Sequence, residues 1–103
     1  MTSILEVLYG EDTARVQKAF ETEDAKILTD LAEDKILAVR LEVAGNENTP
    51  TPSLHKLSKD KDSGVRLQVA GNINADKAII TLLLQDENVS VREEASYSEH
   101  VEA

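Results

Sequence analysis

Apolar and polar positions recur along this chain with a 26-residue period. A leucine, an aspartate and an arginine occur three times in the same order and at the same spacing. A fixed period of this length is typical of stacked structural units, each of which buries its apolar face against the next unit. The three sets are Leu31, Asp34 and Arg40; Leu57, Asp60 and Arg66; and Leu83, Asp86 and Arg92.

Within each unit the pattern predicts two short helices joined by a polar loop. Apolar pairs at i and i+3, such as Leu54 and Leu57, indicate a first helix that ends near the leucine of the period. The aspartate falls in the loop, and the arginine falls on the second helix. Val65 and Val69 form the apolar stripe of the second helix in the middle unit, which predicts that this stripe faces the core.

The residues that begin the first helices occupy equivalent positions. Asp24, Pro50 and Asp76 share one place in the period, and Pro52 follows closely in the middle unit. Proline is tolerated in the first turn because its missing amide hydrogen is not needed there. An aspartate at the same place interacts favourably with the positive end of the helix dipole. We therefore expect a helix to begin at each of these positions.

The second helices carry their own boundary signals. Asp62 and Ser90 are residue types that cap helix N-termini, and Ser90 and Glu93 have the spacing of a capping box. A Gly-Asn pair follows at 45–46 and at 71–72. Both residue types tolerate a left-handed conformation after a helix, so we expect such a turn at both places.

Together these signals predict one all-helical domain over residues 1–103, an α-solenoid of about four two-helix units. Ile4, Leu5 and Leu8 give an apolar face that Gly10 would end, which indicates a degenerate first unit. More polar terminal units protect the open ends of a stack. The expected divisions are a capping repeat at 1–23, repeats at 24–49, 50–75 and 76–98, and a frayed tail at 99–103.

The repeated run resembles the bacterial variant leucine-rich repeat and, more broadly, HEAT-like repeats, over about residues 24–95. The resemblance implies a right-handed superhelix of short paired helices, the first of each pair sometimes 3₁₀ in character. It implies no catalytic residue, because members share a scaffold and differ in role. The matching residues are Val39-Arg40, Val43-Ala44-Gly45-Asn46, Pro50, Leu54, Leu57, Asp60 and Val65-Arg66, with their 26-residue echoes.

Composition narrows the function classes. Hydrophobic residues make up 41% of the chain and aromatic residues only 3%, so the core must consist of Leu, Val, Ile and Ala. Twenty acidic and 11 basic residues give a net charge of −9, which disfavours binding to a phosphate backbone. This charge is compatible with solubility, with a basic protein partner or with imitation of nucleic acid.

Cysteine is absent, and no apolar run approaches the roughly 18 residues needed to span a bilayer. The opening residues 1–3 lack the basic and apolar regions of a signal peptide. Since a chain without cysteine forms no disulfide, we expect a cytoplasmic protein that binds no membrane.

The repeated aspartates and arginines are the first candidates for chemistry. They would form a charged ladder that binds a ligand, or each aspartate would bond loop amides and an arginine of the same or an adjacent unit. A pair that recurs in every unit is better explained by something that every unit needs. We therefore interpret Asp34, Arg40, Asp60, Arg66, Asp86 and Arg92 as a structural ladder.

Other side chains predict no reaction. His55 and His100 are the only histidines, and a zinc site needs three or four converging ligands. The serines and threonines fall mainly at caps and loops, and the glycines form no phosphate loop. We expect no catalytic residue, no metal, no cofactor and no enzyme activity.

Leu41 and Leu67 give the clearest hint of a binding surface. On the second helix each points about 200° away from the valine two positions earlier. Glu42 and Gln68 flank them, and Glu93 takes their place in the last unit. If exposed, the leucines would form an apolar strip with acidic edges; alternatively, they would pack against the neighbouring unit.

Two functions fit the sequence. The first is a non-catalytic adaptor that binds a protein with a basic or mixed apolar and basic surface, as a monomer, with a homodimer left open by the ends of the stack. The second is an acidic inhibitor, encoded by a phage or mobile element, that imitates nucleic acid. Direct DNA binding conflicts with the charge. The carboxylates that would imitate phosphates are Glu21, Glu23, Asp24, Asp30, Glu33 and Glu47.

Overall fold

The computed structural model describes residues 11–100, which form seven α-helices and their connecting loops. No strand occurs in that range, so the prediction of an all-helical chain is confirmed. The helices are α2 (Glu11–Glu21), α3 (Ala25–Leu31), α4 (Leu37–Gly45), α5 (Thr51–Leu57), α6 (Ser63–Ala70), α7 (Lys77–Leu83) and α8 (Val89–Ser96).

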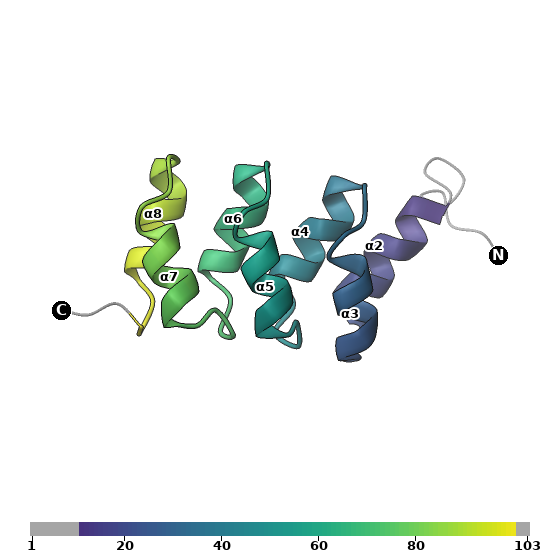
Figure 1. Cartoon of the computed structure of the whole chain (residues 1–103). Helices are drawn as coiled ribbons and strands as arrows, with labels where there is room; N and C mark the ends of the chain where they lie inside the picture. The colour runs from purple at the N-terminus through teal and green to yellow at the C-terminus, as the bar shows by residue number, and fades with distance from the viewer. Residues whose placement is uncertain (1–10, 101–103) are drawn as a thin grey trace.

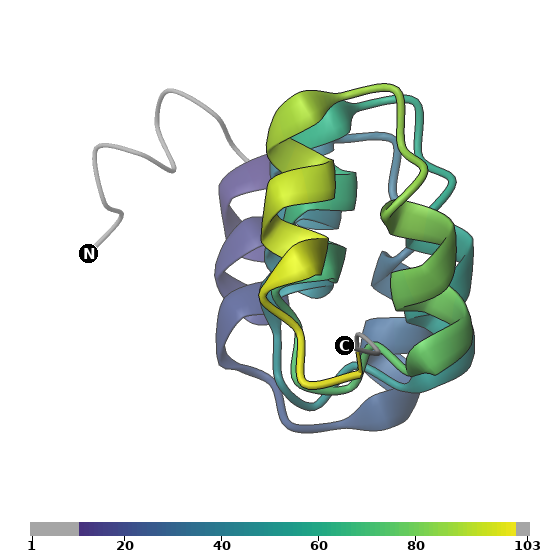
Figure 2. The same cartoon turned by 90° about the vertical axis from the view of Figure 1, so that its left-hand side faces the viewer.

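The helices lie in two rows (Figures 1 and 2). The even-numbered row contains α2, α4, α6 and α8, and each helix of this row packs against the next. The odd-numbered row contains α3, α5 and α7, each of which contacts its sequence neighbours in the other row. The array measures 53 × 25 × 18 Å, and α2 and α8 lie at opposite ends of its long axis (Figure 1).

The core lies between the two rows. Val39 and Val43 of α4 are fully buried, as are Val65 and Val69 of α6, because an i, i+4 spacing places both side chains on one face of a helix. Leu54 contributes from the opposite row and is equally buried. Every buried hydrophobic residue between positions 12 and 100 is Ala, Val, Leu or Ile, which confirms the predicted aliphatic core.

The first helix of each pair begins where the sequence predicts. The Asp24 carboxylate accepts from the amide of Lys26 at 2.8 Å, and the Asp76 carboxylate accepts from the amide of Ile79 at 3.0 Å. Pro50 is the N-cap of α5. All three helices are α-helices rather than 3₁₀-helices, which corrects the character that the family resemblance implies for some members.

The second helices are capped differently from the prediction at one position. Asp62 caps α6, as expected, and accepts from the amides of Gly64 and Val65. Asn88 caps α8, accepting from the amide of Ser90 at 2.9 Å, and Ser90 lies inside the helix. The predicted capping box at Ser90 is therefore wrong. The cap follows the 26-residue period instead, because Asn88 is the equivalent of Asp62.

The left-handed turn predicted after these helices is wrong at Gly45, Asn46 and Gly71. Gly71 has φ −91° and ψ −1°, Asn46 has φ −76° and ψ 125°, and Gly45 is the last residue of α4. The Asn72 side chain is buried, and its Nδ2 donates to the carbonyl oxygens of Ala44 at 2.8 Å and Asn46 at 2.9 Å. The asparagine side chain thus bonds the preceding unit.

Asn46 makes the corresponding bonds one unit earlier. Its Nδ2 donates to the carbonyl oxygens of Ala19 at 2.9 Å and Thr22 at 3.0 Å. Its Oδ1 accepts from the amide of Asn48 at 2.8 Å. The C-terminal ends of α2, α4 and α6 are thus tied together by side chains that are themselves buried.

Some expectations fall on the chain ends. The apolar face of Ile4, Leu5 and Leu8 and the helix stop at Gly10 lie outside the described residues, as do residues 101–103 of the predicted tail. Residues 97–100 form turns and a bend, in which the His100 amide donates to Ser98 Oγ at 3.1 Å. No helix within residues 11–100 is long and apolar enough to cross a membrane.

Candidate functional site

The recurring arginines and aspartates form ion pairs between consecutive units. In each case the arginine Nε donates to an aspartate Oδ2 at 2.8 Å. The arginine comes from an even-numbered helix, and the aspartate comes from the loop of the following unit. The three pairs are Arg15–Asp34, Arg40–Asp60 and Arg66–Asp86.

Two of these arginines also fasten the loop of their own unit. Arg66 Nη1 donates to the carbonyl oxygen of Asp60 at 2.7 Å, and Arg40 Nη1 donates to that of Asp34 at 3.0 Å. The second carboxylate oxygen of Asp86 accepts from the amide of Asn88 at 2.9 Å. Both the cations and the carboxylates of these pairs are therefore occupied by scaffold contacts.

The protonation states of this ladder follow from the same contacts. Burial raises the pKa of Asp86, but hydrogen bonds from Arg66 and the Asn88 amide outweigh it and hold that pKa below its usual value. The hydrogen bond to Asp86 raises the pKa of Arg66. The pKa of Asp34 is lowered in the same way, against the effect of burial. These carboxylates stay charged at neutral pH, which suits an ion pair and not a general acid.

The ladder ends at Arg92. Its Nη1 donates to the carbonyl oxygen of Asp86 in its own loop, as the equivalent arginines do. No ion pair to a following aspartate is found for Arg92 within residues 11–100, and its side chain is exposed. Arg92 thus marks the open end of the array.

Three grooves lie along the even-numbered row. The largest has a volume of about 650 Å³ and is lined by residues of α2, α4 and the C-terminal part of α6. We call it the first groove. Its apolar lining includes Phe20, which is 67% exposed, and Leu41. In the described part of the chain, no lysine or arginine lines it, whereas four carboxylates do, those of Glu21, Glu23, Glu42 and Glu47.

The other two grooves follow along the same row. The second groove, of about 320 Å³, is lined by Leu67, Gln68 and Glu94 among others. The third groove, of about 360 Å³, is lined by Ile73, Glu94 and Tyr97 among others. Ile73 and Tyr97 are 74% and 80% exposed. Among residues 11–100, no lysine or arginine lines either groove.

The structure places most of the predicted surface residues in these grooves. Leu41 and Leu67 are partly buried and pack against the core, and they also line the first and second grooves. Glu42 and Gln68 line the first groove beside Leu41. Glu93 is exposed and lies outside all three grooves. Each leucine therefore both packs against the core and contributes to the groove surface.

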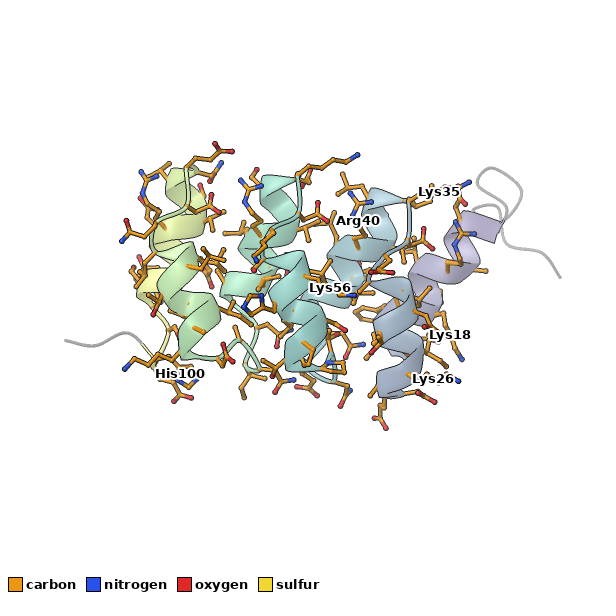
Figure 3. The ribbon with its side chains drawn as sticks, in the orientation of Figure 1. Lys18, Lys26, Lys35, Arg40, Lys56 and His100 are labelled. Atoms are coloured by element: carbon orange, nitrogen blue, oxygen red, sulfur yellow. The ribbon has the colours of Figure 1, made fainter. Side chains whose placement is uncertain are left out.

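The basic side chains lie elsewhere. Figure 3 shows Lys26 and Lys56 on the odd-numbered row. Arg40 belongs to α4 and is held in the ladder by its ion pair with Asp60. Lys56 pairs with Glu33 at 3.1 Å. Lys18 belongs to α2 of the even-numbered row, but it lines none of the three grooves. The charged side chains of lysine and arginine are thus separated from the grooves, which are lined by glutamates.

The histidines do not come together. His55 is exposed on α5, whereas His100 is exposed at the C-terminal end and lines the third groove. Within the described part of the chain, no group of three or more His, Asp or Glu side chains has an arrangement that could hold a metal ion.

Sequence reasoning does not single out Phe20, Tyr97 and Glu94 as surface residues. A usable signal is present, because Glu42, Gln68 and Glu94 share one register of the 26-residue period. Tyr97 lies 26 residues after Gly71, and Phe20 takes the place of Gly45 when Arg15 is aligned with Arg40. Sequence reasoning follows the register of Leu41 and Leu67, which reaches Glu93 in the last unit. It therefore misses the next register, which reaches Glu94.

Comparison of the chain with protein-family models, with curated proteins and with solved structures found no match in any of the three. Its function is therefore inferred from the contacts, grooves and charges described above.

Proposed function

We propose that this chain is a non-catalytic protein-interaction module. Its scaffold would be a right-handed α-solenoid of about four two-helix units, of the variant leucine-rich or HEAT-like repeat type. The 26-residue period supports this proposal, as does the recurrence of the same arginine and asparagine contacts between consecutive helix pairs. Such stacks commonly present an extended surface to a partner.

The observation that carries the proposal is the first groove. An exposed aromatic ring, Phe20, and the partly buried Leu41 line this groove together with four glutamates. A central apolar anchor with a polar rim is the usual anatomy of a protein-binding site. Because no lysine or arginine lines this groove, the fitting partner is a protein with a mixed apolar and basic surface.

The ladder supports a role without catalysis. The acids with shifted pKa values, Asp34 and Asp86, are held by Arg15 and Arg66 in contacts between units. Among residues 11–100, every buried side-chain nitrogen or oxygen has a hydrogen-bond partner. The perturbed groups thus have a structural explanation, and none is left over for acid–base work.

The inhibitor that imitates nucleic acid is favoured less. Of the six carboxylates proposed for that role, only Glu21, Glu23 and Glu47 line the first groove. Asp24 caps a helix, and Glu33 pairs with a lysine on the other row. An imitation of a phosphate backbone needs an uninterrupted array of charge, whereas this groove is also lined by the apolar side chains of Phe20 and Leu41.

A chain without cysteine suits a reducing compartment. We therefore assign the module to the cytoplasm, and we treat it as a monomer.

Affinity capture from the native host tests the proposal when it is done with matched variants. The test variant is Phe20→Glu, in the first groove. The control is Leu82→Glu, an exposed apolar side chain on α7 of the other row. A protein captured by the wild type and the control, and lost with Phe20→Glu, would support the groove. Capture that is unchanged in Phe20→Glu would contradict it.

A further inference from the structure

The three grooves are parts of one continuous trough along the even-numbered row. The first and second grooves share Gly45 and Gln68. The second and third grooves share Gly71 and Glu94. The trough therefore passes the C-terminal ends of α2, α4, α6 and α8, which lie on the same side of the array (Figure 2).

A single register of residues shapes the floor of this trough. Gly45, Gly71 and Tyr97 are spaced by 26 residues near the ends of α4, α6 and α8, and Phe20 takes the same place in α2 when Arg15 is aligned with Arg40, 25 residues later. The middle units have no side chain here, and the aromatic rings stand at the two ends. A β-carbon at Gly71 would lie 3.0 Å from Glu94 Oε1, so glycine leaves room for that carboxylate to lie across the floor.

The same relation holds one unit earlier. A β-carbon at Gly45 would lie 3.0 Å from Gln68 Oε1. Gln68 and Glu94 are equivalent residues, and Glu42 is their counterpart in the preceding unit. Each of these units thus contributes one side-chain oxygen acceptor to the trough at a constant register.

The trough is acidic along its length, most strongly in the first groove, where four glutamates lie, and less so in the second, where only Glu94 does. Six glutamates line it, and neither lysine nor arginine does. The ends of the even-numbered helices add the partial negative charge of their last carbonyl groups. A cationic occupant is therefore required for charge complementarity, and the exposed aromatic rings at both ends offer faces on which a guanidinium group stacks.

We propose that the trough binds an extended peptide segment in which lysine or arginine recurs about every third residue. This inference rests on the proposed function and specifies its partner. Packed helices lie about 8–10 Å apart. An extended chain in the polyproline II conformation rises about 3.1 Å per residue with three residues per turn, so every third side chain lies on the same side. A stretch of about three peptide residues therefore spans one unit, and each basic side chain meets the acceptor that the unit provides.

Two synthetic peptides of equal composition test this register. Both are about 12 residues long, enough to cross about four units, and carry four arginines among leucines and serines. One has an arginine at every third position, and the other has the four arginines in a single run. Binding of each labelled peptide to the full chain is measured by fluorescence anisotropy at low salt, where screening is weakest.

We expect the spaced peptide to bind about tenfold more tightly than the clustered one. Replacing two trough acids, Glu42→Gln with Glu94→Gln, should weaken the spaced peptide by a similar factor. The matched control removes the same charge outside the trough, with Glu33→Gln and Glu87→Gln, and should leave binding within about twofold. Equal binding of the two peptides, or equal losses in both double variants, would overturn the proposal.

The outcome also separates this inference from the proposed function. If the spaced peptide fails to bind while Phe20→Glu still abolishes capture of a host protein, the extended basic ligand is refuted and the interaction module stands. If the spaced peptide does not bind and Phe20→Glu does not abolish capture, both are refuted.

Discussion

Arg66→Ala is the substitution that tests the ladder most severely. Arg66 Nε lies 2.8 Å from Asp86 Oδ2, and Nη1 donates to the carbonyl oxygen of Asp60 at 2.7 Å. The two side chains of the ion pair are only 10% and 7% exposed. The alanine variant therefore removes the cation and leaves the carboxylate of Asp86 largely shielded from water.

The expected cost follows from that burial. Removing one partner of a buried ion pair destabilises a protein by about 3–5 kcal/mol, because an uncompensated charge remains. The Asn88 amide still bonds Asp86 in the variant, so we expect the lower end of that range, about 3 kcal/mol. For a domain of this size each kcal/mol lowers Tm by about 4–8 °C, which corresponds to roughly 12–24 °C.

The chain supplies its own control. Arg92→Ala removes the same side chain at the same register, from the open end of the ladder, where its Nη1 donates to the Asp86 carbonyl and its side chain is exposed. Its expected cost is below about 1 kcal/mol. Urea unfolding followed by circular dichroism gives both free energies of unfolding.

A double-mutant cycle with Asp86→Ala isolates the pair itself. We expect Arg66 and Asp86 to be coupled by about 1–3 kcal/mol. If Arg66→Ala and Arg92→Ala destabilise the chain equally, the contact between units contributes nothing, and the interpretation of the ladder as the scaffold's fastening is refuted.

Three further predictions concern the scaffold. Asn88→Ala should lower the free energy of unfolding by about 1 kcal/mol and Ser90→Ala by less than about 0.5 kcal/mol, measured by urea unfolding. The reverse order would show that Ser90 is the N-cap and would contradict the cap at Asn88. Asn72→Ala should cost about 2–3 kcal/mol in the same assay, because two carbonyl oxygens lose their buried donor, and a neutral result would refute the role of this bond. Because the pKa of Asp86 is lowered in the folded state, its contribution is complete above about pH 4 and is lost as pH falls further. The stability difference between wild type and Asp86→Asn should therefore shrink between pH 6 and pH 2, and a constant difference would contradict the reasoning.

The period of the sequence predicts the helices well because it encodes packing. Val65 and Val69 are buried in α6, and Asp62 caps it, since the apolar stripe and the cap are local properties of one helix. Asp76 and Pro50 begin their helices for the same reason. Local chemistry and periodicity agree at these positions, and such agreement is what makes a prediction reliable.

The predictions fail where a residue serves another unit. Asn46 and Asn72 are of a residue type that is common in turns, yet their side chains donate hydrogen bonds to carbonyl oxygens of the preceding unit. Gly71 suggests backbone freedom, whereas its place is explained by the Glu94 side chain that lies against it. Contacts of this kind depend on how units are stacked, which no single segment of sequence reveals.

The grooved surface is predictable only in part. The sequence places Leu41 and Leu67 on the second helix of their units, but whether they face solvent or a neighbour depends on the spacing between helices. Phe20 and Tyr97 give no periodic signal of their own, because each occurs in an outer unit and the middle units have glycine at the equivalent position. The two rings line the trough at its ends because Gly45 and Gly71, at the equivalent positions between them, have no side chain. This arrangement appears only when the helices are packed into a row.

The most direct test of the trough is a nuclear magnetic resonance titration of the labelled full chain with the spaced arginine peptide. Gly45 and Gly71 line the trough, whereas α3 and α5 belong to the other row. We predict that the largest chemical-shift changes occur at the amides of the two glycines and of Phe20. Changes concentrated on α3, α5 and α7, or no change at any peptide concentration, would contradict the account.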